Sequence, residues 1–213
     1  MSASVLEAVT RFTGDMVRPL TPPDDAKLVQ QTLAGDDSAF ETLVQRHRAV
    51  VTRVAARIVG VSEADDVTQD TFLRAYNRLG QFRGEAPFLS WLLRIANTVA
   101  LNALARRRSV EPALSAEEEQ DGKPAPNRTP ADALEERERR ERLTTKLRLI
   151  QPAHRVVLVL RDLEGLSYEE IALVTDSPLG SVKGRLFRGR RELIEILRHN
   201  TYDWGLPDEP ASA

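Results

Sequence analysis

An acidic, proline-rich segment at residues 109–135 is the feature that most limits how this chain can fold. It contains seven acidic and two basic residues, four prolines and few large apolar side chains. Such a segment cannot bury enough apolar surface to offset the entropy that its ordering would cost. We therefore predict that it is a flexible linker between two small domains, with weakly ordered ends at residues 1–23 and 201–213.

The part before the linker, residues 24–108, shows apolar side chains at helical spacing and no alternation typical of a β-strand. The pattern predicts four helices, near residues 25–33, 37–59, 62–79 and 88–108. Gly60 is expected to end the second helix. Ser62 and Asp65 resemble a capping box at the start of the third. This domain is therefore predicted to be entirely helical.

The part after the linker, residues 136–200, has the pattern of a helix-turn-helix. A charged helix is expected near residues 131–149, and Pro152 suits the first turn of the next helix. Ser167 begins a capping box, and a turn near residues 175–177 leads to the last helix. That helix has four apolar residues on one face: Val182, Leu186, Leu193 and Leu197. We predict an all-α protein of two small helical domains, the second with a helix-turn-helix.

The net charge of −2 conceals two basic segments. Residues 86–110 carry four arginines and no acidic residue, and residues 177–200 carry six basic residues against two acidic ones. Each segment has a net charge of +4, whereas the linker has a net charge of −5. Positive local fields attract nucleic acid, so this distribution bears on function more than the total does.

The last helix carries the residues best suited to DNA. Ser181, Arg185 and Arg188 follow one another at helical spacing and share a face, which Lys183 and Phe187 flank. The planar fork of an arginine matches the O6 and N7 atoms of guanine in the major groove. A solvated basic face is the alternative, and the capped helix and turn before this one favour DNA binding.

The helix near residues 88–108 and the loop before it form a second candidate DNA site. Side-chain amides can contact base edges, arginines can hold phosphates, and the loop could enclose an unstacked base. The candidate residues are Phe82, Arg83, Asn97, Thr98, Asn102, Arg106 and Arg107. A helix whose carboxyl end is stabilised by arginines explains the cluster equally well from the residues alone.

The helix near residues 62–79 carries an acidic stripe, which consists of Asp65, Asp66, Gln69 and Asp70. Asp66 and Asp70 lie four residues apart, and such a like-charge pair is mildly unfavourable in an isolated helix. A basic partner would explain the stripe. A solvated polar face would explain it as well.

The composition argues against several other classes of protein. Without cysteine the chain has no disulfide and no cysteine-based zinc site. Its three histidines are scattered, and no phosphate loop or acid–base pair stands out, so we expect no metal, no cofactor and no enzymatic activity. The longest uncharged run, residues 95–105, is too short to cross a bilayer. Without a signal-peptide pattern, we expect a cytoplasmic location and no membrane insertion.

Taken in order, these segments resemble an extracytoplasmic-function (ECF) sigma factor of the sigma-70 superfamily, the two-domain type of sigma subunit of bacterial RNA polymerase. Four sets of residues carry the resemblance: DDVTQDTFLRAY from residue 65, FRG from residue 82 with FLSWL from residue 88, LEGLSYEEIA from residue 163 and GSVKGRL from residue 180. Their order and separations match the family over about residues 24–198.

The resemblance implies a transcription initiation factor that binds core RNA polymerase, recognises the −10 and −35 promoter elements, promotes melting and is held inactive by an anti-sigma factor. The acidic stripe would dock on the clamp helices of the largest polymerase subunit. The helix near residues 88–108 and its loop would melt the −10 element and capture a flipped base, and the last helix would bind the −35 element. Better-known members use an Asn pair spaced by four, where this chain has Thr98 and Asn102, with Asn97 one place earlier.

Two other functions remain compatible with the residues. A stand-alone helix-turn-helix regulator would bind an operator tightly without polymerase. An adaptor that does not bind DNA would use only the acidic stripe, and it would tolerate alanine at Arg185 and Arg188.

Overall fold

The computed structural model describes residues 25–110 and 142–199, and all regular structure in these two ranges is helical. The predicted linker and chain ends lie almost entirely outside them. The N-terminal half contains α2 (Asp25–Leu33), α3 (Asp37–Val59), α4 (Val61–Asn77), the 3₁₀ turn η1 (Leu79–Gln81) and α5 (Phe88–Val110). The C-terminal half contains a helical turn at residues 142–147, α7 (Pro152–Leu158), the π-helical η2 (Val159–Leu163), α8 (Tyr168–Thr175) and α9 (Leu179–Arg198). The predicted all-α class is confirmed.

The helix ends follow the predicted signals in one case and not in another. Ser167 and Glu170 form the predicted capping box at α8, with hydrogen bonds of 3.1 and 2.8 Å between each side chain and the other residue's backbone N–H. The capping box predicted for Ser62 and Asp65 is absent, because α4 starts directly after Gly60 without a side-chain cap. Gly60 closes α3 and opens α4 at once, with a φ of 109° that favours glycine.

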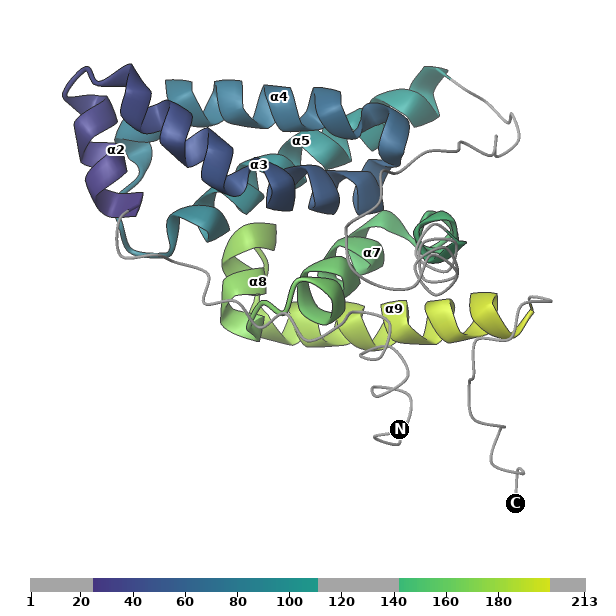
Figure 1. The fold of residues 1–213 in the computed structure, drawn as a ribbon. Helices are drawn as coiled ribbons and strands as arrows, with labels where there is room; N and C mark the ends of the chain where they lie inside the picture. The colour runs from purple at the N-terminus through teal and green to yellow at the C-terminus, as the bar shows by residue number, and fades with distance from the viewer. Residues whose placement is uncertain (1–24, 111–141, 200–213) are drawn as a thin grey trace, which may run out of the picture.

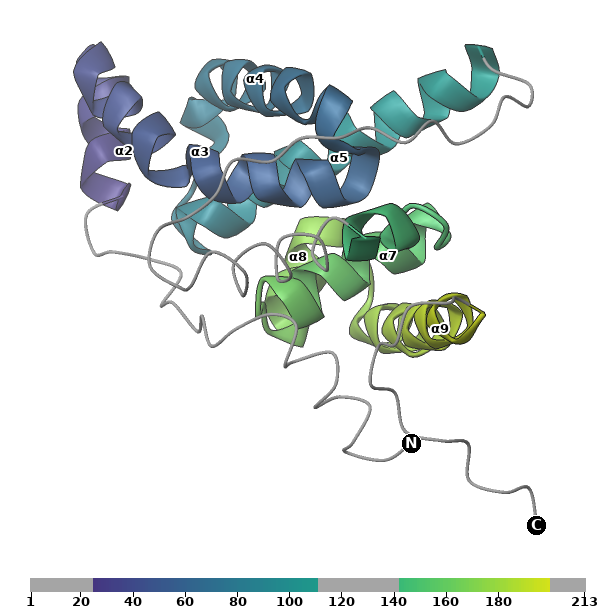
Figure 2. The same cartoon turned by 45° about the vertical axis from the view of Figure 1, so that its right-hand side comes forward.

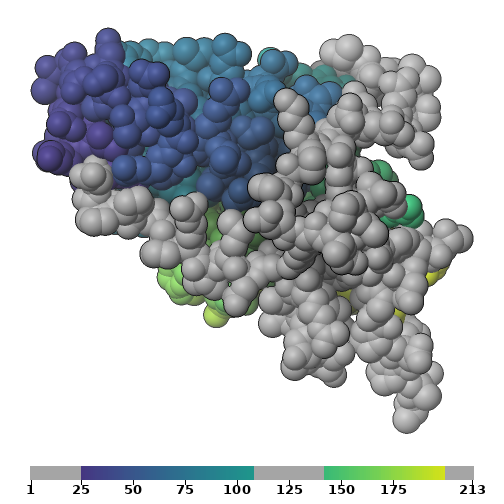
Figure 3. All heavy atoms as spheres, viewed as in Figure 1, coloured from purple at the N-terminus to yellow at the C-terminus, as the bar shows by residue number. Residues whose placement is uncertain are grey.

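The described helices are arranged in two layers. Helices α2 to α5 form the upper layer in Figure 1, and α7 to α9 form the lower one. A turned view keeps the same separation, with α4 on the side of its layer away from α7 to α9 (Figure 2). The space-filling view shows α2, α3 and α4 exposed along the upper face (Figure 3). Helix α9 lies at the opposite edge of the molecule, so α4 and α9 present separate surfaces.

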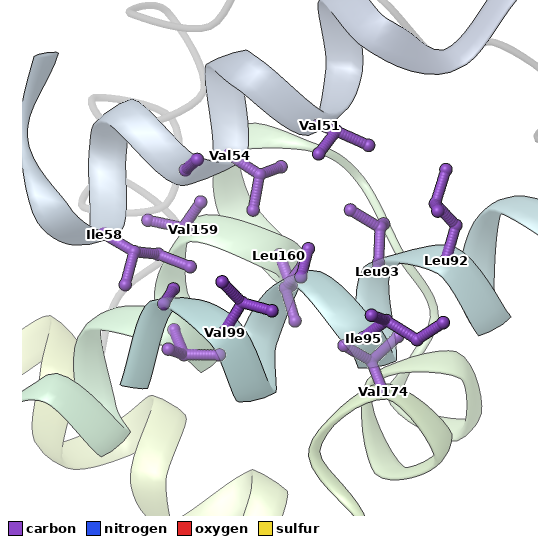
Figure 4. Close-up of a cluster of buried hydrophobic side chains, with 14 of the residues drawn as sticks. Val51, Val54, Ile58, Leu92, Leu93, Ile95, Val99, Val159, Leu160 and Val174 are labelled. Carbon is purple, nitrogen blue, oxygen red and sulfur yellow. The ribbon is translucent and has the colours of Figure 1, made fainter. Parts of the chain in front are cut away.

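One hydrophobic core joins the two layers. Figure 4 shows its centre, where side chains from α3, α5, η2 and α8 meet. The labelled residues are Val51, Val54, Ile58, Leu92, Leu93, Ile95, Val99, Val159, Leu160 and Val174, all at most 8% exposed. The sequence pattern predicts two domains, and no contact between them was predicted from it. The structure adds that the two halves pack on each other.

Polar contacts accompany this shared core. The Glu164 carboxylate, just after η2, accepts hydrogen bonds from Arg53 and Arg57 of α3. Arg155 of α7 is 5% exposed and donates to the carbonyl oxygen of Ile58 at the end of α3. These side chains therefore tie α3 to the C-terminal half.

Helix α5 is the central element of the core. Its segment Phe88–Arg107 is long and apolar enough to cross a membrane by those two criteria alone. However, 61% of that segment is buried inside the fold, as in the core helix of a globular protein.

Candidate protein and nucleic-acid interfaces

The acidic stripe lies on the outer side of α4. Asp65, Asp66 and Gln69 are exposed, and Asp70 is half-buried. The Asp70 carboxylate accepts a hydrogen bond of 2.8 Å from Nε of Arg74 and so raises the pKa of that arginine. Asp66 makes no ion pair with another described residue, so it is the member of the stripe most available to a basic partner.

An apolar groove of about 750 Å³ borders the acidic stripe between α3 and α4. Its lining includes Phe40 of α3 and Leu73 and Tyr76 of α4, and the last two are 59% and 45% exposed. The Tyr76 hydroxyl donates a hydrogen bond of 2.7 Å to Asp37, which fixes the ring at the end of the groove. Exposed apolar side chains beside a charged rim are typical of a protein-binding surface. This groove was not predicted from the sequence.

The candidates on α5 do not share one face. Thr98 and Asn102 are exposed and four residues apart, so they form a short polar ridge. The Thr98 hydroxyl donates to the carbonyl oxygen of Arg94 at 3.0 Å. Asn97 is only 8% exposed, and its buried side-chain oxygen has no hydrogen-bond partner within the described residues. In this arrangement, Thr98 and Asn102 can meet a ligand and Asn97 cannot.

The loop before α5 and the end of α5 supply positive charge. Phe82 is half-buried and packs against Trp91, with ring centroids 5.6 Å apart, so it belongs to the edge of the core. Its neighbour Arg83 is exposed, as is Arg106. Arg107 is exposed too and reaches a carboxylate of α4 at 3.3 Å. The three arginines could therefore contact phosphates, whereas Phe82 is best suited to holding the loop in place.

Helix α9 presents most of its candidates to solvent. The exposed ones are Ser181, Lys183, Phe187 and Arg188. Arg185 is half-buried, and it donates a hydrogen bond of 2.9 Å to the Ser177 hydroxyl in the turn before α9. The opposite face is buried through the four predicted residues Val182, Leu186, Leu193 and Leu197. The predicted division of α9 into a buried and a polar face is confirmed.

Three features of the structure hold α9 in place. Arg190 forms two hydrogen bonds of 2.6 and 2.9 Å with Asp162 of η2, and this carboxylate raises the pKa of Arg190. Gly189 lets α9 approach α7 closely, since a Cβ atom there would lie 3.1 Å from the carbonyl oxygen of His154. Asp176 adopts a left-handed φ of 49° and thereby turns the chain from α8 into α9. The sequence analysis missed Asp162 and His154 as partners of α9.

A buried polar cluster fastens α2 to α3. The Asp25 side chain is 1% exposed and contacts Arg46 at 2.5 Å and Nε2 of His47 at 2.9 Å. Burial lowers the pKa of His47, although the Asp25 charge acts in the opposite direction. In residues 25–110 and 142–199, no group of three His, Asp or Glu side chains is placed to hold a metal ion.

Comparison with known proteins extends these observations to both halves. Residues 43–110 match the family described as Sigma-70 region 2, and residues 140–193 match Sigma-70, region 4. The ECF RNA polymerase sigma-E factor of Salmonella typhimurium is 35% identical over 175 residues, which cover 79% of this chain and 92% of that protein. The RNA polymerase sigma-H factor of Pseudomonas aeruginosa is 35% identical over 186 residues, with coverages of 84% and 96%.

A solved structure agrees with the fold. The structure of CnrH in complex with the cytosolic domain of CnrY superimposes with a TM-score of 0.61 at 28% sequence identity, covering 83% of this chain and 99% of CnrH. The match therefore extends over both layers of helices and is not limited to one of them.

Proposed function

The chain belongs to the extracytoplasmic-function sigma factors of the sigma-70 superfamily, and on that premise we propose how its surfaces divide the work of transcription initiation. One observation carries the proposal. The acidic stripe of α4 lies in region 2, α9 lies in region 4, and helices α4 and α9 lie on opposite sides of the molecule (Figure 1). The surface for core RNA polymerase is therefore separate from the surface for the −35 element.

The polymerase-binding surface consists of the acidic stripe and the groove between α3 and α4. The exposed carboxylates of Asp65 and Asp66 suit a basic rim on the polymerase clamp, and Leu73 and Tyr76 supply the apolar contact. Charged rims mainly set orientation and association rate, whereas desolvated apolar anchors contribute most of the affinity. Asp66 and Leu73 thus have different roles on the same surface.

The −10 element is bound by α5 and the loop before it. Thr98 and Asn102 face solvent and can hydrogen-bond to bases, while Arg83, Arg106 and Arg107 hold phosphates. Asn97 can join them only after a rearrangement that uncovers its side chain.

The −35 element is bound by α9 in the major groove. Ser181, Lys183 and Arg188 point to solvent along its length, and Arg185 lies near the turn. Phe187 is 49% exposed and suits an apolar contact, such as a thymine methyl group. Each good base contact contributes about 1–3 kcal/mol of discrimination.

The shared core defines a closed state that must open on a promoter. The −10 and −35 elements lie about 25 base pairs apart, which is about 85 Å along B-DNA at 3.4 Å per pair. Two domains that share one hydrophobic core cannot contact both elements. We therefore assign the described arrangement to the factor when it is not engaged on a promoter.

The remaining proposals concern regulation and location. The family resemblance and the bound state of CnrH, which is held by the cytosolic domain of CnrY, support control of this chain by an anti-sigma factor in the cytoplasm. The chain acts by binding and opening promoter DNA, and we assign no chemical step to its own side chains.

A charge-reversal experiment tests the polymerase surface. Asp66→Arg is expected to weaken binding to core polymerase about tenfold, or about 1.4 kcal/mol, in a fluorescence titration. The matched control is Glu195→Arg, which makes the same charge change on the exposed side of α9. Equal affinities for both variants would reject the surface. Run-off transcription with and without the protein then separates a sigma factor, which yields new promoter-dependent transcripts, from a stand-alone regulator or an adaptor.

A further inference from the structure

Three polar side chains contact one another between α7 and α9. His154 of α7 lies between Glu192 and Arg188 of α9. Nδ1 of His154 lies 2.6 Å from Oε1 of Glu192. On the other side of the ring, Nε2 of His154 lies 3.2 Å from Nε of Arg188. The histidine is 8% exposed, whereas Arg188 is exposed on the face proposed to meet the −35 element.

The chemistry of the two partners determines the protonation of His154. An arginine Nε–H can only donate a hydrogen bond, so Nε2 of His154 must accept it. An ionised carboxylate can only accept, so Nδ1 of His154 must donate to Glu192. Both contacts together require the neutral ring with its proton on Nδ1. A ring protonated on both nitrogens would keep Glu192 and lose Arg188.

The position of the ring is itself determined by neighbouring contacts. The second carboxylate oxygen of Glu192 accepts a hydrogen bond of 3.0 Å from the backbone N–H of Gln151, just before α7. Gly189 allows the backbone of His154 to lie against α9. The imidazole is therefore fixed relative to the α9 backbone on which Arg188 stands.

Arg188 is held at its Nε and leaves its terminal nitrogens near the open side of α9. These atoms lie 3.6 and 3.7 Å from the position that a Cβ of Gly184 would occupy, one turn earlier. The guanidinium therefore lies alongside the α9 backbone at Gly184. An arginine ordered before binding loses less conformational entropy when it contacts DNA.

We propose that His154 is a positioning residue for promoter recognition, because its neutral ring holds Arg188 in the orientation that contacts the −35 element. The inference rests on the −35 role of α9 proposed above. His154 does not itself touch DNA. Its contribution appears only when Arg188 is present and only while Nε2 is unprotonated.

The contact between His154 and Arg188 depends on the free acceptor at Nε2. A proton on Nε2 would place two donors and two positive charges face to face, so Arg188 would leave its position. Glu192 and Arg188 are the charged groups that face the ring from α9. The neighbouring Arg155 points instead to the backbone carbonyls of Ile58, Arg148 and Ile150.

The test measures the affinity of holoenzyme for promoter fragments with an intact or a scrambled −35 element. Core polymerase from the same bacterium is loaded with each full-length variant. The ratio of the two affinities isolates the −35 contribution from all other contacts. We expect Arg188→Ala to lower this ratio about tenfold. We expect His154→Leu to lower it about fivefold in the wild-type background and not at all in the Arg188→Ala background.

The conservative variant His154→Gln provides the second readout, because its amide oxygen can accept the hydrogen bond from Arg188. The His154→Gln ratio is expected to stay close to the wild-type ratio and well above the His154→Leu ratio, because the contact with Arg188 is kept. The control His199→Gln makes the same change at an exposed histidine at the end of α9 and should retain the wild-type ratio.

The outcomes distinguish a failure of the proposed −35 contact of Arg188 from a failure of the positioning role of His154. If Arg188→Ala leaves the ratio unchanged, the proposed −35 contact of Arg188 is wrong, and the positioning role falls with it. If Arg188→Ala lowers the ratio but His154→Leu has the same effect in both backgrounds, His154 is only structural. If His154→Leu does not fold, a His154→Gln ratio as low as that of Arg188→Ala overturns the inference independently.

Discussion

The closed state depends on a carboxylate that can be neutralised with almost no change in shape. Glu164 follows η2, and its side chain is 5% exposed between the two halves. Oε1 accepts hydrogen bonds from Nε of Arg53 at 3.0 Å and from Arg57 at 2.6 Å, and Oε2 accepts from Arg53 at 2.7 Å. We predict that Glu164→Gln shifts the chain from the closed state toward separated domains.

The size of the shift follows from what glutamine can replace. Hydrogen bonds to charged groups contribute about 1.5–3 kcal/mol each, and breaking a buried ion pair costs about 3–5 kcal/mol. The amide oxygen of glutamine keeps one acceptor, and the Arg53 and Arg57 side chains are 39% and 22% exposed, so water can reach both of them. We therefore expect a loss of about 2 kcal/mol, or about 30-fold in the closing equilibrium.

Electrostatics supports the same direction. The hydrogen bonds from Arg53 to Glu164 raise the pKa of this arginine, against the opposing effect of its burial. The charged form of Arg53 is therefore favoured by the carboxylate. A neutral amide at residue 164 removes that preference.

The assay is a distance measurement between the two halves. The chain has no cysteine, so Asn77→Cys on α4 and Glu195→Cys on α9 introduce two unique labelling sites on exposed positions. Wild type should show one short distance by electron paramagnetic resonance, and Glu164→Gln a longer and broader distribution. Affinity of the holoenzyme for a promoter that carries both elements should rise by up to about 30-fold, because the fraction of the chain able to contact both elements increases.

The control is Glu169→Gln, which neutralises an exposed carboxylate five residues away. It should leave both the distance and the affinity unchanged. If Glu164→Gln behaved like Glu169→Gln in both measurements, the ion pairs would not hold the halves together, and the reasoning from burial would be refuted.

Three further predictions concern stability measured by urea denaturation. Arg190→Gln should lower the free energy of unfolding by about 2–3 kcal/mol, because it leaves the 7% exposed Asp162 side chain unpaired, whereas the same change at exposed Arg191 should have little effect. Ser167→Ala should cost about 1 kcal/mol through the lost helix cap, and Ser167→Asp should restore it. Folding lowers the pKa of His47. Below the pKa of about 6.5 that this residue has in the unfolded chain, the unfolded chain therefore binds a proton here more readily than the folded chain does. Stability should fall between about pH 7.5 and about pH 5.5, and His47→Gln should flatten that dependence.

Local signals predicted the helices and the exposure of most candidate residues on α4 and α9. The four apolar positions of α9 were predicted correctly because an amphipathic helix has one solvent face and one buried face. The cap at Ser167 was predicted correctly because its signal, a serine followed three residues later by a glutamate, is local. The cap at Ser62 failed for a local reason as well. Only one residue separates α3 from α4, and no turn precedes Ser62 in which it could act as an N-cap.

The contact between the halves has no comparable local signal. Arg53 and Glu164 are 111 positions apart, and charged residues on amphipathic helices usually indicate solvent. His154 and Arg188 are 34 positions apart, and nothing in their spacing distinguishes them from other surface residues.

One regional signal does point to the closed core, namely the width of the apolar surface of α5. Its buried residues include Leu92, Leu93, Ile95, Ala96, Val99 and Ala100, which span about 160° of the helix circumference at 3.6 residues per turn. A helix that packs on a single neighbour needs an apolar stripe of only about 100°. Helices α3 and α4 cover part of α5, and α8 covers another part through Val174 (Figure 4). The excess apolar width of α5 therefore indicates a second packing partner, and the structure identifies that partner as the C-terminal half.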